Sequence, residues 1–191
     1  MTASLSEVPP ADGWTVEDLE GLPDDGVRRE LLDGILHVSP SPSTAHQALV
    51  ILLGAALTRG CPEHLFVSQA NDVVLSSRRK FIPDLLVVTF DAAKKPGGKF
   101  QAADVVLAVE IVSPSSQSMD RVMKPALYAK HGIPFYWLIE TENDLSVTTY
   151  RLDPEDRVYQ PTGAFSGGDT IRLAEPWRME IPITEIRPRN L

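Results

Sequence analysis

The sequence has 191 residues, of which 43% are hydrophobic and 23% are charged, as in an ordinary soluble protein with one sizeable core. A net charge of -8 argues against a nonspecific nucleic-acid coat protein, which needs a basic surface. No apolar run is long enough to span a bilayer, no secretory signal opens the chain, and the single cysteine, Cys61, cannot form an internal disulfide, so we expect a cytoplasmic protein without membrane contact.

The start of the chain predicts a tail followed by a short helix. We expect a flexible tail over residues 1–13 and a single domain over residues 14–191. Thr15 is placed to cap a helix over residues 16–22, with Asp18 as the second member of a capping box.

A hairpin and a longer helix come next. Residues 28–40 predict two strands, because Asp33 and Gly34 form a strong tight-turn signal between apolar stretches. Thr44 opens a capping-box pattern, and residues 46–59 show the apolar periodicity of a helix.

The middle of the chain reads as buried strands separated by polar segments. Residues 66–76 predict one strand or a pair of strands, and residues 83–90 and 104–112 each predict a short buried strand. A basic turn is expected at residues 76–80. Residues 91–101 predict a mobile basic loop.

The last part combines a helix, a buried strand and a hairpin. Ser118 is placed to cap a helix over residues 119–131, and residues 135–140 predict a buried strand. Residues 145–152 and 157–163 alternate as an antiparallel hairpin, before a final short strand and a helix or turn. The order of elements predicts an α/β fold, with a mixed central β-sheet flanked by helices and extra antiparallel hairpins.

Two of the predicted buried strands each carry one carboxylate. Asp84 stands at the start of one, and Glu110 is the only charged residue in the run from 105 to 112. If the strands pair, the two acids can meet at one edge of the sheet, where they would repel unless a cation neutralised them. Hard oxygen ligands of this kind suit Mg²⁺, with Mn²⁺ as a substitute.

Each acid also has a purely structural interpretation. Asp84 can be a turn residue after Pro83, and Glu110 can be a strand-end residue that faces solvent or pairs with a base. The second interpretation fits less well, because Ile111 and Val112 continue the apolar run. Taken together, the two acids favour a site.

The pair also carries a resemblance. Pro83-Asp84 followed by Glu110-Ile111-Val112 resembles the PD-(D/E)XK nuclease superfamily, although Val112 stands where a lysine is expected. Over residues 14–152 the chain more specifically resembles the restriction-endonuclease family often called Uma-two. The motifs that carry this are PDLLVV, VEIVSPSS and D-x-x-x-K, with Glu30-Leu31-Leu32-Asp33-Gly34, Ser39-Pro40, His46-Gln47, Tyr128, Gly132-Ile133 and Tyr136-Trp137.

The resemblance implies a restriction-endonuclease-like fold and a Mg²⁺-dependent endonuclease that acts on nucleic acid, with DNA as the expected substrate. It also implies that Lys124, on the following helix, replaces the missing strand lysine, and that Glu30 approaches the metal. Asp120, Lys124 and Tyr128 would share one helix face. Pro125 departs from a regular helix, because it removes a hydrogen bond beside Lys124.

Other roles for these residues remain open. Lys124 can form a surface ion pair with Asp120, and Glu30 can be a hairpin charge beside Arg28 and Arg29. His46 can cap or pack its helix instead of binding a metal, and Tyr128 can be an aromatic core residue instead of a partner for an acid.

The leading hypothesis is hydrolysis of phosphodiester bonds, in which Asp84 and Glu110 hold Mg²⁺ and Lys124 orients water or stabilises charge. The basic residues at 78–80 and 94–95 are candidates to hold the nucleic-acid backbone. A catalytically inactive nuclease-like binding or regulatory module is the alternative, and an acid/base hydrolase without metal is a third class. A homodimer is expected, because two symmetric sites suit duplex cleavage.

Overall fold

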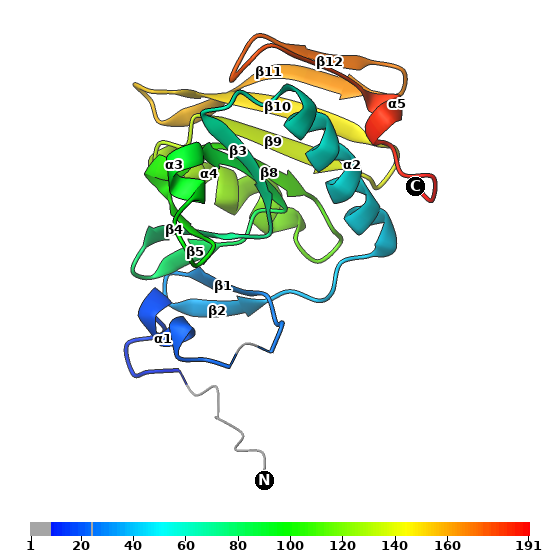
Figure 1. The fold of residues 1–191 in the computed structure, drawn as a ribbon. Helices are drawn as coiled ribbons and strands as arrows, with labels where there is room; N and C mark the ends of the chain where they lie inside the picture. The colour runs from blue at the N-terminus through cyan, green and yellow to red at the C-terminus, as the bar shows by residue number, and fades with distance from the viewer. Residues whose placement is uncertain (1–8, 24) are drawn as a thin grey trace.

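The computed structural model describes residues 9–23 and 25–191, so the predicted tail over residues 1–13 lies largely outside the described residues. Figure 1 shows the elements in chain order. They are α1 (Val16–Glu20), β1 (Arg29–Leu32), β2 (Ile35–Val38), α2 (Thr44–Gly60), β3 (Leu65–Gln69), β4 (Asp72–Ser76), β5 (Arg79–Phe81), β6 (Leu85–Thr89), α3 (Phe90–Ala93), β7 (Lys99–Gln101), a 3-10 turn (Ala102–Asp104), β8 (Val105–Ile111), a π-helix (Met119–Met123), α4 (Lys124–Lys130), β9 (Phe135–Glu140), β10 (Ser146–Asp153), β11 (Val158–Ser166), β12 (Thr170–Leu173), β13 (Met179–Pro182) and α5 (Ile183–Ile186).

The strands form one six-stranded sheet, one five-stranded sheet and a separate pair. The six-stranded sheet has the order β11-β10-β9-β8-β6-β3, and the five-stranded sheet has the order β2-β1-β5-β4-β7. In the larger sheet β8 and β9 run parallel, whereas the other neighbours run antiparallel. This mixed sheet, with helices against it and antiparallel hairpins beside it, confirms the predicted fold class.

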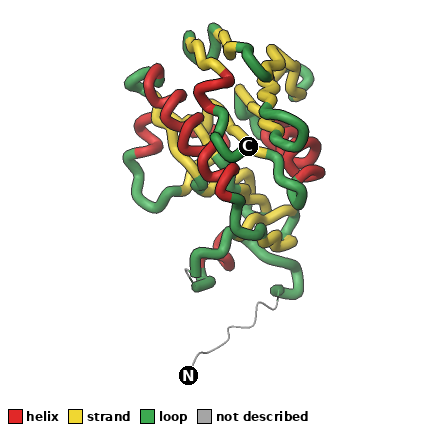
Figure 2. Tube along the Cα trace, turned by 90° about the vertical axis from the view of Figure 1, so that its right-hand side faces the viewer, coloured by secondary structure: helices red, strands yellow, loops and turns green. Residues whose placement is uncertain are grey.

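The larger sheet is covered on both faces. Apolar side chains of α2, among them Leu49, Leu53 and Leu57, pack against one face in the larger core cluster. Tyr128 of α4 belongs to a second buried cluster on the other face, and Leu127 packs against that cluster. In Figure 1 α2 runs across the front of the sheet and α4 lies behind it, and the turned view in Figure 2 shows the helices and strands as separate layers. No helix within the described ranges is long and apolar enough to cross a membrane.

Local sequence signals account for several of these elements. Thr15 and Asp18 form the predicted capping box at the start of α1. Asp33 and Gly34 have φ values of 51° and 84°, which is the left-handed pair that a tight hairpin turn requires. The predicted cap of α2 was wrong by one residue: Ser43, not Thr44, accepts the hydrogen bond from the N–H of His46.

The structure refines one further prediction and overturns two others. The segment 66–76 does form two strands, but β3 lies in the six-stranded sheet and β4 in the five-stranded sheet. The expected mobile loop at 91–101 is wrong, because its ends form the last part of α3 and the strand β7, which pairs in parallel with β4. Ser118 does not cap its helix; its backbone is already helical and its side chain makes no capping hydrogen bond.

Candidate functional site

The pairing of β6 with β8 brings Asp84 beside Glu110. Leu85 lies opposite Val109 in this antiparallel pair, so the register continued by one residue places Asp84 opposite Glu110. Side chains that are directly opposite in an antiparallel pair lie on the same face. The backbone N–H of Ile111 also donates to Oδ2 of Asp84 at 2.9 Å, which fixes the carboxylate against β8.

Glu110 is buried between two residues of α4. Its side chain keeps 2% of its exposure, the hydroxyl of Tyr128 donates to its Oε1 at 2.8 Å, and the ammonium of Lys124 donates to its Oε2 at 3.1 Å. The interpretation in which Glu110 faces solvent is therefore wrong, whereas its pairing with a base is confirmed by the contact with Lys124. Tyr128 combines the two roles considered for it, since its ring also packs against Phe81 at a centroid distance of 5.8 Å.

Lys124 is the centre of a buried ionic cluster. Its Nζ lies 3.0 Å from Glu30 Oε1, 3.1 Å from Glu110 Oε2 and 3.2 Å from Asp120 Oδ1. The side chain is only 5% exposed, so the surface ion pair considered for Lys124 is wrong: the contact with Asp120 exists, but it is buried and shared. Three acids around one ammonium leave a surplus of negative charge.

Two of these acids differ in how well their oxygens are satisfied. Glu30 is buried in β1, and its Oε1 also accepts the N–H of Ile82 at 2.8 Å, so it is not an exposed hairpin charge. Oδ1 of Asp120 is buried and, apart from its ion pair with Lys124, accepts no hydrogen bond of good geometry from any described residue. A buried carboxylate oxygen of this kind is costly unless a cation or a ligand meets it.

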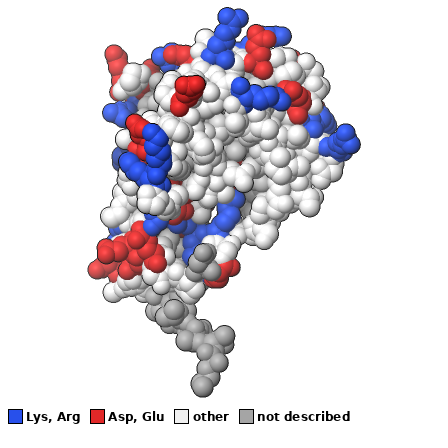
Figure 3. Space-filling view, in the orientation of Figure 1, with Lys and Arg blue, Asp and Glu red and all other residues white. Residues whose placement is uncertain are grey.

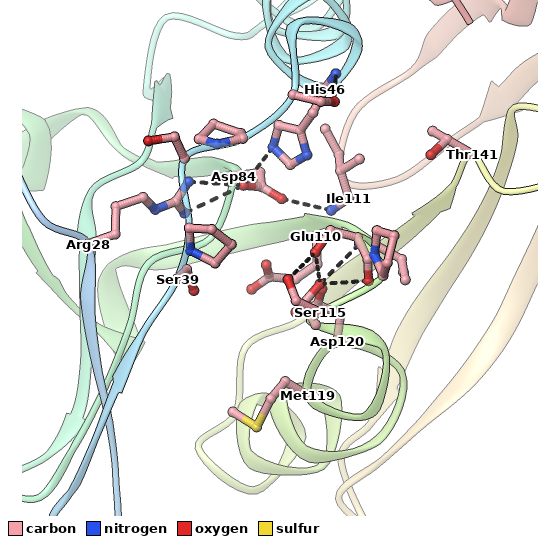
Figure 4. A pocket seen from close by; sticks show the side chains of 18 of the residues that line it. Arg28, Ser39, His46, Asp84, Glu110, Ile111, Ser115, Met119, Asp120 and Thr141 are labelled. Atoms are coloured by element: carbon pink, nitrogen blue, oxygen red, sulfur yellow. Dashed lines mark hydrogen bonds and ion pairs between the residues drawn. The ribbon is translucent and has the colours of Figure 1, made fainter.

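Asp84, which immediately precedes β6, has a different set of partners (Figure 4). His46 Nε2 lies 3.1 Å and Arg28 Nη1 lies 3.4 Å from its Oδ1. Arg28 is held in turn by a hydrogen bond from Nη2 to the carbonyl oxygen of Ile82 at 2.7 Å. Positive and polar groups therefore surround Asp84, whereas Glu110 faces one cation and several other acids.

These surroundings move the pKa values of the two central acids apart. Burial raises the pKa of Glu110 well above its ordinary value, and the charges of Asp120, Asp84 and Glu30 add to this against the opposing effect of Lys124. Burial also acts to raise the pKa of Asp84, but the hydrogen bond and charge of His46 and the N–H of Ile111 outweigh it, so this pKa is lowered. Two carboxylates whose pKa values differ in this way can take different chemical roles.

The pKa of Glu110 makes stability depend on pH. Its ordinary value is 4.5, and the folded value is higher, so between these two pH values the folded protein binds a proton that the unfolded chain does not. The free energy of unfolding contributed by Glu110 is complete near pH 4.5 and is lost as the pH rises through the folded pKa. In Glu110→Gln this proton uptake is absent, so we expect its Tm to change less between about pH 4.5 and 7.5 than that of the wild type. Calorimetry across this range tests the difference, and parallel pH profiles would contradict it.

The acids and Lys124 line one cavity of about 430 Å³. Two serine- and proline-rich segments, residues 39–43 and 113–116, form other parts of its wall. Val112, at the position where the superfamily has lysine, also lines the cavity and is 8% exposed. Lys124 reaches the cavity from the helix, so the cation and the acids meet although the strand has no lysine.

The donor set fits a hard divalent cation of the Mg²⁺ type. Among residues 9–23 and 25–191, no three His, Cys, Asp or Glu side chains are arranged to hold a metal ion by themselves. Mg²⁺ does not need such a cage, since it usually takes one or two carboxylates and keeps several waters. The surplus of acids fits an added positive charge, and Oδ1 of Asp120 has no other described partner than its ion pair with Lys124.

The cavity gathers all six residues that the sequence singled out: Glu30, His46, Asp84, Glu110, Lys124 and, behind Glu110, Tyr128. Sequence reasoning missed Arg28 as a partner of Asp84, because the two are 56 positions apart and no local pattern links them. It treated Asp120 only as a helix neighbour of Lys124; the D-x-x-x-K spacing was the available signal that both face one site.

The basic segments lie away from this cavity. Lys80 is buried and bonded to Asp72 at 3.0 Å, and Lys94 pairs with Asp91 at 3.0 Å. Neither these two nor Arg78, Arg79 and Lys95 line the cavity. On the face drawn in Figure 3, acidic and basic side chains alternate around the edges and leave a broad uncharged area between them. This face has no continuous basic surface for a nucleic-acid backbone.

Comparisons with known proteins identify the family and the fold of the chain. The profile of the Uma2 family, described as "Putative restriction endonuclease", matches residues 16–184. A crystal structure of a "putative nuclease belonging to DUF820" from Anabaena variabilis ATCC 29413 superimposes with a TM-score of 0.69 at 18% identity, covering 90% of this chain and 96% of that one. This likeness shows a shared fold. No protein of curated function matches the chain significantly. Because the family match spans most of its length, the chain belongs to the Uma2 family.

Proposed function

We propose that the protein is a Mg²⁺-dependent endonuclease that hydrolyses phosphodiester bonds of nucleic acid, with DNA as the first candidate, and that it acts as a homodimer. The observation that carries the proposal is the meeting of Asp84, Glu110 and the Lys124 ammonium in one cavity. Membership of a family described as restriction endonucleases supports the same class of reaction.

The residues of the cavity have distinct parts in this proposal. Asp84 and Glu110 would hold the ion, which when bound supplies Lewis-acid polarisation of a phosphoryl oxygen and lowers the pKa of bound water. Burial lowers the pKa of Lys124, but the charges of Glu110, Glu30 and Asp120 raise it by more. The pKa therefore lies above its ordinary value, and Lys124 stays protonated. Its fixed ammonium would orient the attacking water or stabilise charge on the phosphate. Arg28, whose side chain is 29% exposed, is accessible to a phosphate oxygen.

A cleavage assay with metal replacement tests the proposal. The protein is incubated with plasmid, single-stranded DNA and RNA in the presence of Mg²⁺, Mn²⁺ or EDTA. We expect cleavage with either metal, no cleavage with EDTA, and loss of cleavage in Asp84→Ala and Glu110→Ala. Asp91→Asn is a matched control, because this exposed acid lies in α3, which follows the far end of β6, and does not line the cavity.

The alternatives predict other outcomes of the same assay. Absence of both cleavage and metal-induced stabilisation would favour an inactive nuclease-like binding or regulatory module, which the net charge of -8 and Val112 support. Cleavage that survives EDTA would favour acid/base hydrolysis by the carboxylate pair. Cleavage that survives both alanine substitutions would contradict the proposed site.

A further inference from the structure

The helix that carries Lys124 begins with a widened turn. Met119–Met123 form a π-helix, in which the N–H of Lys124 donates to the carbonyl of Met119, five residues back. The next residue is Pro125, which has no N–H. In this pattern the carbonyl oxygen of Asp120 would accept a hydrogen bond from the N–H of residue 125. Because residue 125 is a proline, the carbonyl lacks this backbone donor.

A side chain from the central sheet supplies the missing donor. The hydroxyl of Tyr136, on β9, donates to the carbonyl oxygen of Asp120 at 2.6 Å, and both residues are buried. This distance is that of a good O–H···O bond. Tyr136 lies opposite Ala108 in the parallel pairing of β9 with β8, the strand that carries Glu110. The widened turn is thus tied to the strand beside Glu110.

Tyr136 is itself held in place by other aromatic rings. Its ring centroid lies 5.5 Å from Tyr159 in a stacked arrangement, 5.9 Å from Tyr150 and 6.1 Å from Tyr128. Burial raises the pKa of the Tyr136 hydroxyl well above its ordinary value, so the hydroxyl remains a donor at neutral pH. A rigid, protonated donor of this kind can fix the position of a turn.

We propose that Tyr136 is a positioning residue for Lys124. Its hydroxyl takes the place of the N–H that Pro125 cannot provide, and so keeps the widened turn in the geometry that brings the Lys124 ammonium 3.1 Å from Glu110. The link acts on the backbone of Asp120, so it also orients the second acid on this turn. For its effect on catalysis, the inference rests on the proposed endonuclease function.

Hydrogen exchange tests the link without reference to activity. In Tyr136→Phe the carbonyl of Asp120 loses its donor, and we expect amide exchange in residues 119–124 to become about tenfold faster. Tyr159→Phe is the matched control, because its hydroxyl donates to a different carbonyl, that of Ile133, at 2.8 Å. Exchange in residues 119–124 should remain unchanged in this control.

Substitution of Pro125 provides a rescue. In the double variant Tyr136→Phe, Pro125→Ala, the new alanine N–H can reach the carbonyl of Asp120, so slow exchange should return. If Tyr136→Phe alone does not fold, Pro125→Ala is compared with the double variant, and the two should exchange alike. Equal exchange in Tyr136→Phe and Tyr159→Phe, or failure of the alanine to restore protection, would overturn the inference.

Kinetics connect the link to catalysis. If the wild type cleaves nucleic acid, Tyr136→Phe should lower kcat about tenfold with little change in KM, and the double variant should recover most of the loss. Unchanged kcat in Tyr136→Phe would overturn the positioning role. If the wild type shows no cleavage, the proposed function fails, and the exchange experiment still decides whether Tyr136 holds the turn.

Discussion

Lys124→Met is expected to lower the free energy of unfolding by about 3–5 kcal/mol, because it leaves buried acids without their cation. The ammonium contacts Glu30, Glu110 and Asp120 within 3.2 Å, and all three are buried. For a chain of this size, about 1 kcal/mol corresponds to roughly 2–4 °C in Tm, so the change is easily seen in thermal or urea unfolding.

Two further variants isolate the cause of this loss. Addition of Glu110→Gln to Lys124→Met removes one of the uncompensated charges, so the double variant should be more stable than Lys124→Met alone. Lys94→Met is the matched control, since Lys94 is exposed and its contacts with Asp91 and the Phe90 ring lie on the surface; its effect should stay within about 1 kcal/mol. A Lys124→Met protein as stable as this control would show that the buried cluster contributes no net stability.

Glu110→Gln is expected to separate stability from activity. Glutamine keeps the size of the side chain and resembles the neutral form that burial favours, so folding no longer has to suppress the ionisation of this side chain. We therefore expect the variant to be more stable than the wild type at neutral pH, by about 1 kcal/mol or more. Under the proposed function it should also lose at least about a hundredfold in cleavage rate, because the ion loses a charged ligand.

The comparison for this variant is Glu140→Gln. Glu140 lies at the end of β9 and pairs with Arg121 on the surface, so its substitution should change neither Tm nor cleavage appreciably. The two measurements are thermal unfolding at pH 7 and initial cleavage rates with Mg²⁺. A Glu110→Gln protein that is less stable than the wild type would show that the hydrogen bonds of the carboxylate outweigh its repulsion.

Local patterns predicted the elements that local physics determines. The Asp33-Gly34 turn needs two left-handed residues, and the apolar run around Glu110 predicted a buried strand, which the structure has as β8. The resemblance to the family added Lys124, which spacing alone would have left as a surface residue. The roles of these side chains in catalysis remain a prediction.

The features that sequence reasoning missed are non-local. Whether β3 and β4 share a sheet depends on strands that are distant in sequence, and β7 forms only because β4 offers a parallel partner. Arg28 lies next to β1 of the five-stranded sheet, and Asp84 lies next to β6 of the six-stranded sheet. No periodicity in the sequence indicates that these two residues are in contact. Pro125 signalled a disturbed helix, but the π-helix and the compensating hydroxyl of Tyr136 became visible only in three dimensions.

The contacts of Lys124 have a consequence for the mechanics of the fold. Glu30 belongs to β1 in the five-stranded sheet, and Glu110 belongs to β8 in the six-stranded sheet. The Lys124 ammonium therefore links the two sheets through ionic contacts of 3.0 Å with Glu30 and 3.1 Å with Glu110. Sliding of one sheet past the other would break these contacts, so Glu30, Glu110 and Lys124 stay together only while the two sheets remain docked.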